Sequence, residues 1–158
     1  MTFSGVENQS VEPIITNYEF PNNSEGDWDG NWLNIYINVK SKMGNWQTVH
    51  PLLTTWDVLV LTDWFDTLSK NAQPKYRDVS FTEPNLSFKL LNSFDSEVKT
   101  IRIKFDHESR PVSATDGKEY YVDCMPDNNE LKRLAIDLKM ELSKYPERKP
   151  ANKSGDRD

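Results

Sequence analysis

The chain has few of the residues that cross-link small proteins. Its 158 residues include one cysteine and two histidines. Cys124 has no second cysteine to pair with, so an intramolecular disulfide is excluded and a reducing compartment suits the chain. A zinc site needs more cysteine or histidine ligands in close pairs than this sequence offers. We therefore expect no metal, no cofactor and a fold that is stabilised by packing alone.

Long apolar runs are also missing. None approaches the roughly 20 residues that are needed to cross a bilayer. Residues 1–10 have neither the basic nor the apolar segment of a secretory signal. We expect a cytoplasmic protein that makes no membrane contact.

Basic residues are scarce relative to acidic ones. Nineteen lysines and arginines stand against 25 aspartates and glutamates, which gives a formal charge of -6. This balance repels phosphate backbones and argues against direct nucleic-acid binding, whereas it attracts a basic protein. No lysine or arginine precedes Lys40, but six acids do: Glu7, Glu12, Glu19, Glu25, Asp27 and Asp29. An acidic N-terminal face is expected.

Motifs for catalysis are absent as well. The chain has no glycine-rich phosphate loop, no nucleophile elbow and no paired-histidine metal motif. Cys124 falls on the apolar side of a predicted strand, where a thiol usually packs. Asp63 and Asp66 share one face of a predicted helix, but an acid pair of the glycosidase kind also needs a cleft. We expect no enzyme activity and no catalytic residue.

Periodic apolar residues predict two helices. Thr54 and Asp57 have the spacing of a capping box at the start of a helix over 54–70, which has apolar residues at helical spacing. Asp127 and Glu130 repeat this start before a second apolar stripe that runs down to Pro146. Both helices are amphipathic and need a sheet to cover.

Alternating apolar and polar residues predict about six strands. They lie at residues 14–20, 32–40, 46–50, 86–90, 97–106 and 120–124. The expected fold class is α+β: one antiparallel sheet of about six strands with one inserted helix and one C-terminal helix. Residues 1–146 form a single domain in this interpretation. Residues 147–158 have no large apolar side chain, so they are predicted to be a disordered tail.

Residues 21–30, here called the acidic loop, are rich in turn-forming residues. We expect this loop to contact a cationic partner through Glu25, Asp27, Trp28 and Asp29, together with Asp63 and Asp66 on the first helix. A calcium site at residues 27–31 is an alternative, although the further acids and terminal glutamate of an EF-hand loop are missing. Trp28 is the only tryptophan outside a predicted element, which leaves a carbohydrate- or small-ligand-binding module as a second alternative.

Glu83, Pro84 and Asn85 interrupt two apolar stretches. Because Pro84 fixes its own backbone and favours an extended Glu83, this segment is predicted to be a rigid corner between strands. Glu83 either bonds nearby backbone or is displayed. We favour a structural role.

Several short runs resemble one known family, the WapI-type immunity proteins of bacterial polymorphic toxin systems. The most telling run is Phe81-Thr82-Glu83-Pro84-Asn85-Leu86-Ser87-Phe88, and the others are Tyr18-Glu19-Phe20-Pro21, Asn31-Trp32-Leu33 and Leu53-Thr54-Thr55-Trp56. The resemblance covers residues 14–105. It implies a cytoplasmic protein that binds and neutralises the C-terminal toxin domain of a secreted protein, and it implies no catalytic residue.

The name-giving toxin of that family is a tRNA nuclease, but members accompany varied toxins. The resemblance therefore does not identify the toxin. A nuclease must be cationic to grip RNA, so an acidic inhibitor gains in association rate. The composition of this chain is compatible with such a basic partner.

Overall fold

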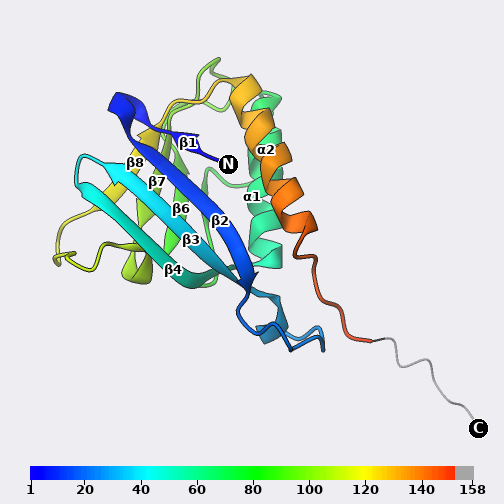
Figure 1. Cartoon of the computed structure of the whole chain (residues 1–158). Helices are drawn as coiled ribbons and strands as arrows, with labels where there is room; N and C mark the ends of the chain where they lie inside the picture. The colour runs from blue at the N-terminus through cyan, green and yellow to red at the C-terminus, as the bar shows by residue number, and fades with distance from the viewer. Residues whose placement is uncertain (152–158) are drawn as a thin grey trace, which may run out of the picture.

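The computed structural model describes residues 1–151, which form two antiparallel sheets and a pair of helices (Figure 1). The strands of the first sheet are β1 (Phe3–Ser4), β2 (Ser10–Tyr18), β3 (Trp32–Ser41) and β4 (Gly44–Thr54). Those of the second sheet are β5 (Asp78–Ser80), β6 (Leu86–Leu90), β7 (Ile101–Phe105) and β8 (Tyr120–Cys124). The helices are α1 (Thr55–Ser69) and α2 (Asn128–Ser143), and the short 3-10 turns are η1 (Val6–Asn8), η2 (Asp29–Asn31) and η3 (His107–Ser109). In Figure 1 the helices lie side by side along one flank of the two sheets.

The α+β class is confirmed, but the single sheet of about six strands is wrong. All six predicted strands are present with shifted bounds, and they divide between two sheets of four. The two additional strands, β1 and β5, have two and three residues, which is too short for an alternating pattern. Residues 1–10 contain β1, η1 and the first residue of β2. Alternation identifies the buried face of a strand and not its partner, so it could not show that α1 divides the sheets.

The two sheets meet where β1 lies next to β8. Gly5 forms an isolated antiparallel bridge with Cys124, which joins the end of the first sheet to the last strand of the second. A Cβ atom on Gly5 would lie 2.6 Å from a methyl carbon of Val122. Glycine is therefore required for this close approach.

Both helices begin at the predicted capping residues. The Asp57 amide donates to Thr54 Oγ1 (3.2 Å), and the Thr54 amide donates to Asp57 Oδ2 (2.8 Å), which confirms the capping box. At α2 the Glu130 amide donates to Asp127 Oδ1 (2.8 Å). Neither of these helices, the two within residues 1–151, has the length and apolar character of a membrane span.

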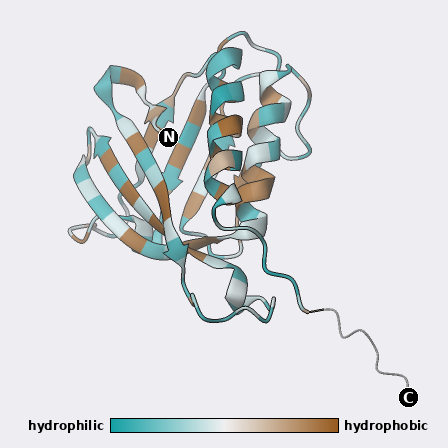
Figure 2. Ribbon diagram, turned by 45° about the vertical axis from the view of Figure 1, so that its right-hand side comes forward, coloured by the Kyte–Doolittle hydropathy of each residue, from teal (hydrophilic) through white to brown (hydrophobic). Residues whose placement is uncertain are grey.

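An aromatic core joins the sheets to α1. Trp46 on β4 lies edge-on to Phe105 and Tyr120 of the second sheet, with ring centroids 5.3 and 6.0 Å apart. Phe88 on β6 contacts Phe65 on α1, with centroids 5.9 Å apart. Figure 2 shows hydrophobic residues alternating with hydrophilic ones along the strands, as this one-sided burial requires. The sheets and helices thus share one continuous core.

Lys99 is the one charged residue that is fully buried in the described part of the chain. Its Nζ donates to Asn71 Oδ1 (2.5 Å) and to Asn128 Oδ1 (2.6 Å). Burial lowers the pKa of Lys99. Because Asn71 follows α1 and Asn128 begins α2, this lysine ties the two helices together at one end.

Candidate protein-binding surface

The acidic loop connects β2 to β3 and is held by its own side chains. Asp27 Oδ1 accepts hydrogen bonds from the Gly30 amide (2.8 Å) and from Asn23 Nδ2 (3.0 Å). Asn23 Oδ1 in turn accepts from the Glu25 amide (3.2 Å). Asp27 therefore shapes the loop, while Glu25 and Asp29 are exposed.

Trp28 lies on this loop with 52% of its surface exposed. Its ring packs against Trp56 of α1, with centroids 5.0 Å apart and the planes tilted by 35°. Trp56 Nε1 donates to Glu147 Oε1 (2.9 Å). Trp28 thus presents one part of its ring to solvent while another part is packed on the protein itself.

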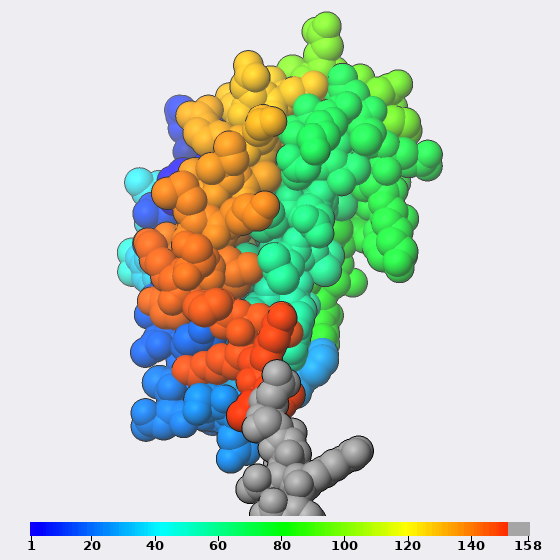
Figure 3. Space-filling view, turned by 90° about the vertical axis from the view of Figure 1, so that its right-hand side faces the viewer, coloured from blue at the N-terminus to red at the C-terminus, as the bar shows by residue number. Residues whose placement is uncertain are grey.

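Residues 145–149, here called the C-terminal strap, pack against the acidic loop. Arg148 lies over the Tyr18 ring (3.6 Å to the centroid) and donates to the carbonyl oxygens of Phe20 (2.8 Å), Pro21 (2.8 Å) and Asn23. Asn31 Nδ2 donates to the Arg148 carbonyl (3.0 Å). Figure 3 shows the strap next to the acidic loop, below the two helices. Residues 152–158 of the predicted tail lie outside the described part of the chain.

The two helical acids belong to a different region. Asp63 is exposed, whereas Asp66 accepts a hydrogen bond from Lys70 Nζ (2.8 Å). That hydrogen bond, more than the nearby charges of Lys132 and Lys139, lowers the pKa of Asp66. Both acids are two to three turns beyond Thr55, which bonds to Asn31 beside the acidic loop. At 1.5 Å per residue this separation is about 12 to 16 Å along α1.

The expected acidic N-terminal face is likewise divided. Glu7 forms an ion pair with Lys42, which lies in the β3–β4 turn. Glu19, Glu25 and Asp29 lie at the opposite end of β2, in or next to the acidic loop. The first 39 residues therefore supply acids to two ends of the first sheet.

A second feature at the acidic-loop end is an open pocket of about 360 Å³, here called the acidic pocket. It is lined by Glu19, Trp32, His50, Pro51, Glu83, Asn85 and Glu108. Glu19 comes from the chain after β2, Glu83 from the β5–β6 turn and Glu108 from η3. Sequence reasoning missed this pocket because its acids are far apart in the chain. The predicted corner at Glu83 was the only feature of this pocket that the sequence singled out.

The second sheet holds one wall of this pocket rigidly. The Asn85 carbonyl accepts a hydrogen bond from the Asp106 amide (2.9 Å) and another from Ser109 Oγ. Trp46 Nε1 donates to the Ser109 carbonyl (2.9 Å), which fixes this segment to the first sheet. His107 between them has a φ of 49°, a left-handed conformation that few side chains adopt. The segment carrying Glu108 is thus fastened on both sides.

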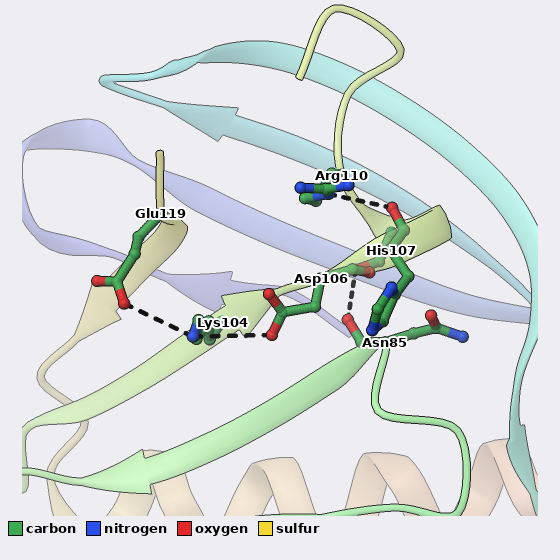
Figure 4. Close-up of polar contacts among 7 residues, drawn as sticks. Asn85, Lys104, Asp106, His107, Arg110 and Glu119 are labelled. Carbon is green, nitrogen blue, oxygen red and sulfur yellow. Dashed lines mark hydrogen bonds and ion pairs between the residues drawn. The ribbon is translucent and has the colours of Figure 1, made fainter. Parts of the chain in front are cut away.

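The cation next to this wall is already paired. Figure 4 shows Lys104 between Asp106 and Glu119, with Nζ to carboxylate distances of 3.8 and 3.6 Å. Arg110 is turned toward the His107 carbonyl, with Nε 3.5 Å from the oxygen. Neither forms an ion pair with Glu19, Glu83 or Glu108, and no other described residue does.

Burial affects Glu19 in particular. Partial desolvation, followed by the negative charge of Asp29, raises the pKa of Glu19. Across residues 1–151, no three His, Cys, Asp or Glu side chains come together closely enough to hold a metal ion. The lining of the acidic pocket is thus rich in acceptors and includes no lysine or arginine among the described residues.

A larger hollow of about 440 Å³ lies between β1, the second sheet and α2. Its lining includes Phe3, Ile101, Cys124 and Leu134, with Arg133 and Asp137 from α2. Burial raises the pKa of Cys124 to about 12, so the thiol is not a nucleophile at neutral pH. The packed role predicted for Cys124 agrees with this environment.

Comparison with known proteins identifies a family. A sequence model of the Immunity protein WapI-like family matches residues 2–146. This match spans both sheets and both helices. No curated protein and no solved structure matches the chain significantly. The chain belongs to the Immunity protein WapI-like family.

Proposed function

We propose that this protein neutralises a cognate toxin by binding its C-terminal domain stoichiometrically in the cytoplasm, without performing chemistry. The observation that carries the proposal is the family match over residues 2–146. The partner is the toxin domain of a secreted protein of a polymorphic toxin system. A basic nuclease is the toxin class that best complements a formal charge of -6.

The proposed contact surface is the acidic-loop end of the molecule. Glu25 and Asp29 are exposed carboxylates beside the half-exposed ring of Trp28, a combination of charge and anchoring aromatic that suits a protein interface. Asp27 contributes by holding the loop in shape. Asp63 and Asp66 form an outlying part of the surface on α1.

The test uses the variable C-terminal domain of the large secreted protein that we expect the neighbouring reading frame to encode. Calorimetric titration should give a one-to-one complex whose affinity falls with added salt. The double variant Glu25→Lys/Asp29→Lys should weaken binding at least about tenfold, because like charges then oppose a basic partner. Absence of any complex with the wild-type chain would refute the proposed function.

A matched control is Glu97→Lys. Glu97 is exposed and immediately precedes Val98, which bridges to Asp127 at the start of α2, whereas the acidic loop packs on the strap after the end of α2. This change alters the net charge in the same direction, at the end of the helix pair where α2 begins. Its effect on affinity should stay within about twofold. An equal loss of affinity in Glu97→Lys would mean that binding depends on the net charge of the protein and not on the acidic loop.

A further inference from the structure

The acidic pocket brings several carboxylates together without a cation. Some acids of the protein have a cationic partner, as in the pair of Arg102 Nε and Asp123 Oδ1 at 2.8 Å. Glu19, Glu83 and Glu108 converge from three chain segments and form no ion pair with any described residue. A cation that enters the pocket would therefore meet carboxylates that no described residue already pairs.

Asn85 gives an independent sign of a ligand. Its side chain is 96% buried, since 4% of the residue surface is exposed, and it lines the pocket. Its Oδ1 has no hydrogen-bond partner, although the Asn85 backbone is fully engaged with Glu83 and Asp106. Figure 4 shows the side chain pointing away from the Lys104 ion pairs. A buried acceptor left unpaired is costly, so a donor supplied from outside would relieve it.

The lining selects the kind of donor. The pocket offers three carboxylates and one amide oxygen, which are acceptors. His50 and the Asn85 amide nitrogen add donors, and the Trp32 and Pro51 side chains form apolar walls. An arginine side chain has five N–H donors, no acceptor and a flat face that packs on apolar groups. A saccharide stacks on a broad exposed ring, whereas only 8% of the Trp32 surface is exposed.

We propose that the acidic pocket is the receptor for one basic side chain, best an arginine, of the bound toxin domain. This inference rests on the proposed function and names the contact through which the partner is recognised. The pocket is fixed before binding, because the hydrogen bonds from Asp106 to Asn85 and from Trp46 to Ser109 hold its wall. An arginine that enters therefore meets groups already in position, which favours binding.

A titration that needs no toxin tests the pocket directly. The probe is N-acetyl-arginine amide, added to the full-length ¹⁵N-labelled chain, and the readout is the side-chain NH₂ signal of Asn85. We expect a saturable shift with this probe. The isosteric but neutral citrulline amide should give no shift. The arginine shift should also be lost in the double variant Glu83→Gln/Glu108→Gln, but not in Glu97→Gln.

The same substitutions connect the pocket to the partner. Against the toxin domain, Glu83→Lys and Glu108→Lys should each raise the Kd at least about tenfold, and Glu97→Lys should change it less than about twofold. If the wild-type chain binds the toxin and the pocket variants bind equally well, the pocket inference fails and the proposed function stands. If no toxin binds, the proposed function fails and the arginine titration still decides the pocket.

Other occupants would give their own result. A shift of the Asn85 signal with calcium or with an oligosaccharide, and none with the arginine probe, would overturn the assignment.

Glu83 and Glu108 are exposed and lie in turns, so variants at these two positions should fold. A far-UV circular dichroism spectrum identical to that of the wild type checks this point.

Discussion

Glu19 lies where its ionised form is unfavourable in the free protein, although the proposed binding of a cation requires that form. Partial burial and the charge of Asp29 both disfavour its ionised form, and they raise its pKa. The pKa of Glu19 is thus higher in the folded protein than in the unfolded chain. Between these two pKa values the folded protein binds more protons. Its stability falls as the pH rises through that window. The loss of stability is complete above the pKa of Glu19 in the folded protein. It is absent below the pKa of Glu19 in the unfolded chain.

We therefore expect Glu19→Gln to stabilise the free protein at pH 7, by up to about 1 kcal/mol, as optimised surface charges do. The gain should vanish below the ordinary glutamate pKa of 4.5, where the carboxyl is protonated in both states. Urea unfolding at pH 7 and at pH 4 measures both values. The exposed Glu97→Gln is the control for removing one surface carboxylate. A variant less stable than the wild type at pH 7 would contradict the argument.

The C-terminal strap shows how an element without regular secondary structure is held. Arg148 is its anchor, because its guanidinium donates to four backbone carbonyls and packs on the Tyr18 ring. The carbonyls belong to Phe20, Pro21, Asn23 and Gly30, so these contacts also order both ends of the acidic loop. The shape of the proposed binding surface thus depends on a residue beyond the last helix.

Arg148→Ala should lower the free energy of unfolding by about 1–2 kcal/mol, the scale of a few hydrogen bonds to a partly exposed charge. It should also make residues 20–31 the first site of limited proteolysis. Arg148→Lys should recover less than half of the stability, because an ammonium cannot match the flat guanidinium. Arg133→Ala, at an exposed position on α2, is the control. Unchanged proteolysis in Arg148→Ala would show that the loop is ordered by its own contacts.

The strap also shows where sequence reasoning ends. Thr54 and Asp127 predict the two helix starts correctly because a cap is formed by residues three apart. Arg148 binds carbonyl oxygens up to 128 residues earlier in the chain, and no local pattern encodes such a contact. The acidic pocket was missed for the same reason, since Glu19, Glu83 and Glu108 meet only through the fold. The acidic loop could be recognised from its composition. The hydrogen bonds by which Asp27 holds the loop in shape could not.

At the scale of the whole molecule, the charged residues of the proposed surface and the aromatic residues of the core lie in separate regions. The proposed contacts of the acidic loop and the acidic pocket lie at one end of the sheets. Cross-sheet packing is formed by aromatic side chains such as Trp46 and Phe105. Charge substitutions at that end therefore remove no core contacts. This separation is what allows charge-reversal variants to be interpreted as binding variants.

The continuous core leads to a prediction about folding. Phe88 contacts both Phe3 of the first sheet and Phe65 of α1, so neither sheet can be exposed without opening the packing of the other. We expect one cooperative unfolding transition in urea, as for most single domains of this size. Tryptophan fluorescence, which reports on Trp46 between the sheets, and far-UV circular dichroism should give coincident curves. Phe88→Ala should shift both together and cost about 3–5 kcal/mol. Two separated transitions would mean that the sheets unfold independently, because the Phe88 contacts would then not couple them.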